Sequence, residues 1–126
     1  MRMMGIDYGH KKVGIAFSDE AGMMAFPHGV IKNDSSLLEE IVSLAEEKAV
    51  GEIVIGHSLD REGNANKIHT KVEEFIGDLT LQLGLPVHLE PEQYTTQEAM
   101  RFQGRTDKTD AAAAAIILNS YITRSK

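Results

Sequence analysis

The order of short apolar runs and amphipathic segments is the feature that most limits how this chain can fold. Two apolar runs, residues 2–7 and 12–19, are separated by the turn-like stretch "YGHK", and a third run follows at residues 23–32. Runs of this length bounded by turn residues are typical of strands. Three strands in succession indicate an antiparallel meander.

The rest of the chain alternates between helical and strand-like segments. Residues 33–50 place apolar side chains at helical spacing, and Ser36 with Glu39 can form a capping box at the start of this helix. The segments that follow are expected to be a strand, a helix that ends at Gly84, another strand and two helices: residues 52–56, 67–84, 85–90, 95–104 and 109–126. This order predicts an α/β fold with one mixed sheet, in which right-handed crossovers add parallel strands to the meander and helices cover the faces.

Three acids stand where predicted strands end. Asp7 closes the first apolar run, and Glu90 and Glu92 close the fifth strand. Ligands gather at the carboxyl ends of parallel strands, and a carboxylate buried there must be paired with a base or held for a cation. For Asp7 the residues alone leave two interpretations open: a turn-forming acid that Lys11 or Lys12 neutralises, and a ligand for a bound cation.

Length and composition limit the class of protein. The 126 residues fit a single domain, 1–126, whose core is large enough to fold without disulfides or a structural metal. The chain has no cysteine, which fits a reducing compartment and excludes a zinc site built on sulfur. An acid interrupts the first apolar run and no stretch approaches the length of a membrane span, so we expect a cytoplasmic protein with no membrane partner.

The net charge of −6 argues against a nonspecific coat for nucleic acids, but the charge is unevenly distributed. The acids are concentrated in residues 35–98, whereas residues 99–126 carry more bases than acids. We therefore expect an anionic partner to approach the two ends of the chain.

Four blocks of sequence carry more specific information: "GIDYGHKKVGIAFSD", "EIVIGHSLDREGN", "PEQYTTQEA" and "TDAAAAAIILNSYI". Together they resemble the YqgF (RuvX) family of the ribonuclease-H-like superfamily, over essentially the whole chain. The resemblance implies a ribonuclease-H-like fold, with helices on both faces of a five-stranded mixed sheet of strand order 3-2-1-4-5. The order of elements is consistent with that topology.

The resemblance also implies a catalytic site of three acids. Matched to the family's motifs, these are Asp7 in the first block, Glu92 before the paired threonines, and Asp110 at the start of the last helix. Hydrolysis of a phosphodiester needs an activated water and stabilisation of a leaving oxygen, which two divalent ions can supply. We expect the three acids to bind two ions of Mg²⁺ or Mn²⁺, because these ions prefer oxygen ligands.

This chain departs from the family's pattern beside the second acid. Pro91 and Gln93 stand where the family has Asp and Arg, and Ser58 stands where it usually has Pro. These changes affect groups near the metal ligands and leave the three acids in place. Glu90, two residues before Glu92, can project to the same face of an extended strand and is a reserve ligand.

Several bases could contact the phosphates of a nucleic acid without reading its sequence. His57, after the fourth predicted strand, could orient a water or a phosphate, although an exposed loop histidine is the simpler interpretation. The candidate phosphate-binding residues are Lys11, Lys12, Arg101, Arg105 and Lys108, with a solvated surface as the alternative.

The resemblance implies a metal-dependent endonuclease that processes the 5′ end of precursor 16S ribosomal RNA during ribosome biogenesis, with the small-subunit precursor as a partner. Cleavage of four-way DNA, as by a Holliday junction resolvase, is the alternative, and the fold does not separate the two. Symmetric resolution of a junction needs two sites, so a monomer favours RNA and a homodimer favours DNA.

Two other classes of function are open. The spacing from Asp7 to Gly9 and Gly14 also begins nucleotide-binding domains of the actin and hexokinase type, but those proteins build their cleft between two such domains. A nucleic-acid-binding module that has lost catalysis is conceivable because of Pro91 and Gln93. Retention of all three acids argues against it.

Overall fold

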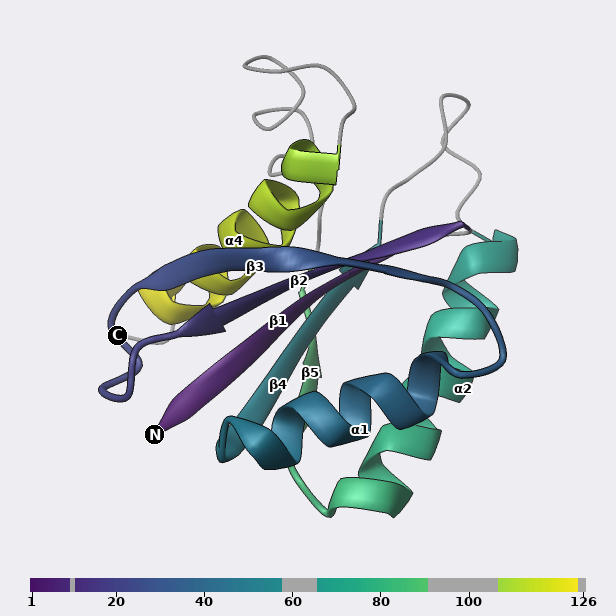
Figure 1. Ribbon diagram of the computed structural model, residues 1–126, viewed down its shortest axis with the longest axis horizontal. Helices are drawn as coiled ribbons and strands as arrows, with labels where there is room; N and C mark the ends of the chain where they lie inside the picture. Colours follow the sequence, from purple (N-terminus) through teal and green to yellow (C-terminus); the bar gives the residue numbers. More distant parts are fainter. Residues whose placement is uncertain (10, 58–65, 91–106, 125–126) are drawn as a thin grey trace.

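The structure is a computed structural model that describes residues 1–9, 11–57, 66–90 and 107–124. Its strands form one five-stranded sheet, with α4 on one face and α1 and α2 on the other (Figure 1). The strands are β1 (Arg2–Tyr8), β2 (Lys12–Ser18), β3 (Ala25–Lys32), β4 (Val50–His57) and β5 (Val87–Leu89). The helices are α1 (Leu37–Glu47), α2 (Asn66–Leu83) and α4 (Asp107–Arg124).

The strand order is β3-β2-β1-β4-β5, which confirms the predicted topology. The first three strands pair antiparallel, as expected of a meander, whereas β4 pairs parallel with both β1 and β5. The carboxyl ends of β1, β4 and β5 therefore lie at the same edge of the sheet.

Alternation along β1 divides its side chains between two apolar cores. Met4, Ile6 and Tyr8 belong to the core that α1 and α2 cover. Met3 belongs to the core under α4, and Asp7 faces the same way because side chains of a strand alternate with a period of two. The only charged residue in the interior of β1 is thus directed to the α4 face.

The alanine run of α4 brings this helix close to the sheet. Ala113, Ala114 and Ala115 are buried, and Leu118 on the next turn is fully buried. The closest approach is at Gly5 of β1, where an added Cβ would lie 2.8 Å from the carbonyl oxygen of Ala114 and 2.9 Å from Cβ of Leu118. Small residues on both sides of this contact allow the backbones to approach.

The predicted capping box at the start of α1 is wrong. Ser36 occupies the N-cap but its side chain makes no capping hydrogen bond. Instead, both its backbone N–H and its hydroxyl donate to Oδ1 of Asp34, at 3.0 and 2.8 Å. The Ser36 hydroxyl is the main cause that holds the pKa of Asp34 below its ordinary value. The Ser36 hydroxyl is thus oriented toward Asp34 and accepts no hydrogen bond from the first turn of the helix.

Helices α1 and α2 are each followed by a residue with positive φ, but only one of these residues is a glycine. Gly84 follows α2 with φ 65°, and its N–H donates to the carbonyl of Thr80 at 2.9 Å, so the predicted glycine stop is confirmed. Ala49 follows α1 and its cap residue with φ 53°, a conformation that a Cβ disfavours.

Ala49→Gly is therefore expected to stabilise the protein by about 1 kcal/mol, because glycine removes the steric cost of the left-handed conformation. Ala49 is exposed, so the loss of its methyl group leaves the packing intact. Urea unfolding monitored by circular dichroism would measure the change. Ala112→Gly, inside α4, serves as the opposite control and should destabilise the protein by about 1 kcal/mol.

Some sequence-based expectations concern the C-terminal third of the chain. The helix expected at residues 95–104 lies outside the described residues, and α4 begins at Asp107, two residues earlier than expected. Within the described ranges, no helix has both the length and the apolar content to cross a bilayer.

Candidate functional site

Asp7 is the penultimate residue of β1, near the edge where the parallel strands end. It is only 7% exposed, although most of the surrounding side chains of β1 and β4 are apolar. Burial of a carboxylate is costly unless ionic or hydrogen-bonding partners compensate for the lost water. This burial excludes a fully solvated carboxylate at Asp7, and both a paired base and a bound cation remain consistent with it.

The two positions that flank Asp7 in the sheet are both glycine. Asp7 is paired with Gly14 of β2 on one side and with Gly56 of β4 on the other. Directly paired residues carry their Cβ atoms about 4.5–5.5 Å apart on the same face of a sheet. Because Gly14 and Gly56 have no Cβ, neither directly paired residue places a side chain beside the Asp7 carboxylate on the α4 face.

A second buried carboxylate lies in the same row of the sheet. Glu90 follows β5 directly, and its N–H donates to the carbonyl of Ile55 at 2.8 Å, which places it alongside Gly56. Glu90 is 3% exposed, and the hydroxyl of Ser120 on α4 donates to its Oε1 at 3.2 Å. Glu90 and Asp7 thus face the same side of the sheet, with Gly56 between them.

The structure describes less of the other two predicted acids, Glu92 and Asp110. Glu92 lies outside the described residues, and so do Pro91, Gln93 and Ser58. Asp110 lies in the first turn of α4, where the structure describes the backbone but not this side chain. The helix runs back along the sheet in the direction opposite to β1 (Figure 1), and Ala114, one turn after Asp110, sits over Gly5. The backbone of Asp110 therefore lies toward the end of the sheet that holds Asp7.

The predicted phosphate-binding bases are only partly described. Lys11 and Lys12 are exposed at the turn between β1 and β2, at the same edge as Asp7. Arg101 and Arg105 lie outside the described residues, as does the side chain of Lys108. His57 ends β4 opposite Tyr8, but its side chain is likewise outside the description.

The glycines beside Asp7 were not among the predicted site residues. Gly14 interrupts the apolar run "KVGIAF", and Gly56 ends the run "EIVIG". A glycine inside a strand often marks a place where a ligand or another backbone approaches closely. This signal was available in the sequence, but only the strand register shows that both glycines flank the same carboxylate.

Proteins of similar sequence are named for one activity. A protein of Maridesulfovibrio salexigens is 30% identical over 135 residues, covering 99% of this chain and 100% of its own length. A protein of Salinibacter ruber is 35% identical over 135 residues, covering 98% of this chain and 94% of its own. Both carry the name "Putative pre-16S rRNA nuclease".

Solved structures of similar fold include nucleases and a kinase. RuvC of Thermus thermophilus in complex with a Holliday junction substrate superposes with a TM-score of 0.64 at 14% identity, covering 99% of this chain and 95% of RuvC. A ROK hexokinase from the same organism gives a TM-score of 0.53 at 20% identity, covering 83% of this chain and 38% of the hexokinase. At these identities the similarity establishes the ribonuclease-H-like fold alone.

The match to a family model extends over nearly the whole chain. The model is described as "RuvX: Holliday junction resolvase" and matches residues 1–124. Both the family and the relatives carry the names of nucleases. The resemblance recognised in the four sequence blocks is thus confirmed, and the chain belongs to the RuvX family of nucleases.

Proposed function

We propose that residues 1–126 form one domain of a metal-dependent endonuclease that processes the 5′ end of precursor 16S ribosomal RNA. The observation that carries the proposal is the buried Asp7 carboxylate, which lies between two glycines at the carboxyl end of a central strand. The relatives' name supports RNA as the substrate. Ribosomal RNA is made in the cytoplasm of bacteria such as these, so we propose the same location for this chain.

The residues present fit a pair of Mg²⁺ or Mn²⁺ ions. The ligands we propose are Asp7, Glu92 and Asp110, which supply only oxygen atoms, as these ions prefer. When bound, two such ions activate a water and stabilise charge on the leaving oxygen. In this proposal Asp7 is the fixed ligand, because its strand is central and its side chain is buried.

Glu90 has a supporting role in this proposal. Its backbone is bonded to β4 and its carboxylate accepts a hydrogen bond from Ser120, so it ties α4 to the sheet beside the site. A fixed α4 holds the backbone of Asp110 near the end of β1. Glu92 therefore remains our choice for the second ligand, with Glu90 in reserve.

The proposed site also needs contacts for the nucleic-acid backbone. Arginine and lysine commonly position a strand through its phosphates, without reading the bases. We assign this role to Lys11, Lys12, Arg101, Arg105 and Lys108. A small-subunit precursor is the partner in which such an RNA end would be presented.

Cleavage of four-way DNA is the second candidate, favoured by the description of the matching family model. A resolvase of this kind must make two symmetric cuts and so needs two sites at a fixed distance. Light scattering after size-exclusion chromatography tests this requirement, because a stable dimer supports the DNA candidate and a monomer supports RNA.

A cleavage assay with a panel of substrates tests the proposed function. The wild type with Mg²⁺ or Mn²⁺ is offered an RNA with the precursor 16S 5′ extension, an unrelated single-stranded RNA and a four-way DNA junction. We expect cleavage of the first substrate, with product ends near the mature 5′ terminus and none after chelation of the metal. Cleavage of the junction alone would favour the DNA candidate, and no cleavage of any substrate would contradict both.

A further inference from the structure

The outer side of β3 is an open edge of the sheet in the described part of the chain. β3 stands at one end of the strand order and pairs with β2 alone. An edge strand presents N–H and C=O groups that can pair with another chain. Proline has no N–H to contribute, so Pro27 limits such pairing to the second half of β3, from Gly29 onward.

The hydrogen-bonding pattern shows which backbone groups of β3 point outward. The N–H of Asn33 donates to the carbonyl of Lys11 at 2.9 Å. The pair that precedes this bond, Lys12 with Lys32, is therefore a non-hydrogen-bonded pair of the antiparallel ladder. Such pairs alternate with hydrogen-bonded ones, so Val30 is in the same phase as Lys32. The N–H and C=O of Val30 thus point away from β2, toward the open edge.

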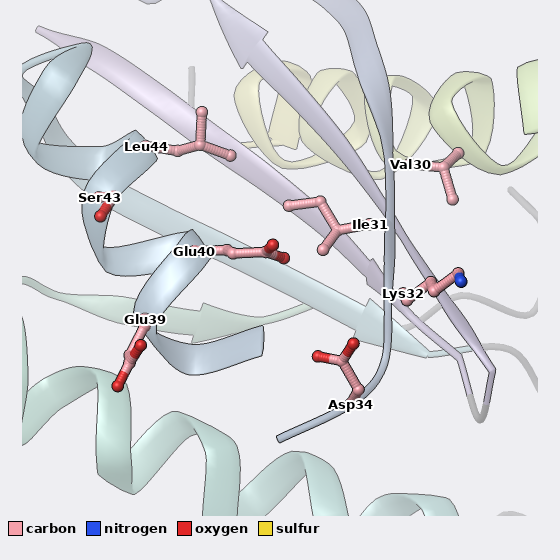
Figure 2. Close-up of a pocket in the computed structure, with 8 residues that line it drawn as sticks. All are labelled: Val30, Ile31, Lys32, Asp34, Glu39, Glu40, Ser43 and Leu44. Carbon is pink, nitrogen blue, oxygen red and sulfur yellow. The ribbon is translucent and has the colours of Figure 1, made fainter. Parts of the chain in front are cut away.

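This edge borders a groove between β3 and α1. The groove has a volume of about 600 Å³, and its lining includes Val30 and Ile31 of β3 and Leu44 of α1. Figure 2 shows the side chains of Ile31 and Glu40 pointing toward one another across it. Ile31 and Leu44 are partly buried against the core, so they give the groove an apolar floor. A strand paired with Val30 would lay alternate side chains over this floor.

The rim of the groove is acidic. Asp34, Glu39 and Glu40 line the groove together with one base, Lys32. The hydrogen bonds from Ser36 and, to a lesser degree, the charge of Lys32 lower the pKa of Asp34. Both glutamates are exposed. The groove therefore keeps a net negative charge toward solvent, even with Lys32 set against Asp34.

The stability of α1 does not explain its charge. Its sequence, LLEEIVSLAEE, carries four glutamates and no base. Glu46 and Glu47 lie in the last turn, where negative charge opposes the helix dipole. A cationic partner beside α1 would relieve this repulsion.

We propose that the outer edge of β3 and the acidic groove beside it bind an extended, lysine- and arginine-rich segment of a partner protein. The segment adds a strand to the sheet by pairing with the backbone of Val30. The methylene stems of its basic side chains lie on Ile31 and Leu44, and their charged ends reach Glu39 and Glu40. The same acids repel a polyanion, so this surface is unsuited to RNA.

Peptide binding tests the charge of the groove. The probes are two short labelled peptides, one of alternating lysine and valine and one of alternating glutamate and valine, followed by fluorescence anisotropy. We expect the lysine peptide alone to bind the wild type. The double variant Glu39→Gln and Glu40→Gln should bind it roughly tenfold more weakly at low salt. The control, Glu74→Gln with Asp78→Asn, removes the same charge from exposed positions of α2 and should bind as the wild type does.

Exchange of the Val30 amide proton, measured by NMR, tests strand addition directly. The lysine peptide should slow this exchange, because the outward N–H then donates to the peptide backbone. Val30→Pro removes that N–H but no bond to β2, so it should weaken binding of the peptide and leave the sheet intact. Binding that the two glutamine substitutions do not weaken, or that leaves exchange at Val30 unchanged, would overturn the proposal.

The same samples distinguish other occupants of the edge. A dimer that Val30→Pro dissociates, seen by light scattering, would assign the edge to a second copy of this chain and overturn the proposal. Slower exchange at Val30 with single-stranded RNA in place of the peptide would contradict a protein partner.

The proposal goes beyond the nuclease function and is independent of it. The groove lies on the α1 side of the sheet, whereas Asp7 faces α4. If the wild type binds the lysine peptide at Val30 but cleaves nothing with Mn²⁺, the docking surface stands and the nuclease proposal fails. If it cleaves RNA but does not bind the peptide, the nuclease stands and the docking surface is refuted.

Discussion

Asp7→Asn is expected to lower the rate of RNA cleavage by roughly 10³-fold or more, equivalent to about 4 kcal/mol in the barrier. The substitution keeps the size of the side chain but removes the charge that holds a divalent ion. Asp7 is buried in a central strand between Gly14 and Gly56, so neither of the residues paired directly with it has a side chain that can take its place. Single-turnover cleavage with Mn²⁺ measures the change.

Thermal unfolding with and without Mn²⁺ gives a second measure of the Asp7→Asn variant. A ligand that binds only the folded state raises stability, by about 2.7 kcal/mol at a hundred times its dissociation constant. We expect Mn²⁺ to raise the Tm of the wild type and to raise that of Asp7→Asn much less. Without metal, the Tm of the variant should be close to that of the wild type, because asparagine preserves the size of the buried side chain.

Asp78→Asn is the control for this loss of charge, because Asp78 is exposed on α2, on the face of the sheet opposite Asp7. It should retain both cleavage and the response to Mn²⁺. Equal cleavage by Asp7→Asn and the wild type would show that Asp7 is not a metal ligand of the reaction.

The fold could be predicted from the sequence because hydrophobic periodicity and connection length leave few topologies. The meander followed from three apolar runs with short turns, and the parallel strands followed from the amphipathic segments between them. The helix stop at Gly84 was also readable, since glycine adopts positive φ at low cost. The predicted capping box is wrong because Ser36 could bond either to Asp34 or to the first turn of the helix. Sequence spacing does not rank these two possibilities.

The site was only partly predictable, because strand register cannot be read from one sequence. Asp7 stood out as an acid after an apolar run, but the register was needed to show that both its neighbours are glycine. The register also pairs Lys12 with Lys32, which are 20 positions apart in the chain. Glu90 is buried beside α4, and sequence spacing does not show that Ser120 of this helix contacts it.

Gly5→Ala is expected to destabilise the protein by about 1–3 kcal/mol and to lower cleavage further than this loss of stability explains. The new Cβ would lie within 3 Å of the carbonyl oxygen of Ala114 and Cβ of Leu118, neither of which is the flexible end of a side chain. Relief of the clash requires α4 to move away from β1, and Asp110 moves with its helix. A misplacement of about 1 Å can cost about 10²-fold in rate.

Gly29→Ala separates this clash from the general effect of replacing a strand glycine. Gly29 lies in β3, and no atom lies within 4 Å of a Cβ added there, so its replacement should leave cleavage unchanged and stability equal or slightly higher. Urea unfolding gives the stability of each variant, and single-turnover cleavage at a temperature where both are folded gives the rate. A Gly5→Ala variant as active as Gly29→Ala would mean that α4 can shift without moving a catalytic group. The acid on its first turn would then have no part in the chemistry, and the site would have to be built from the sheet alone.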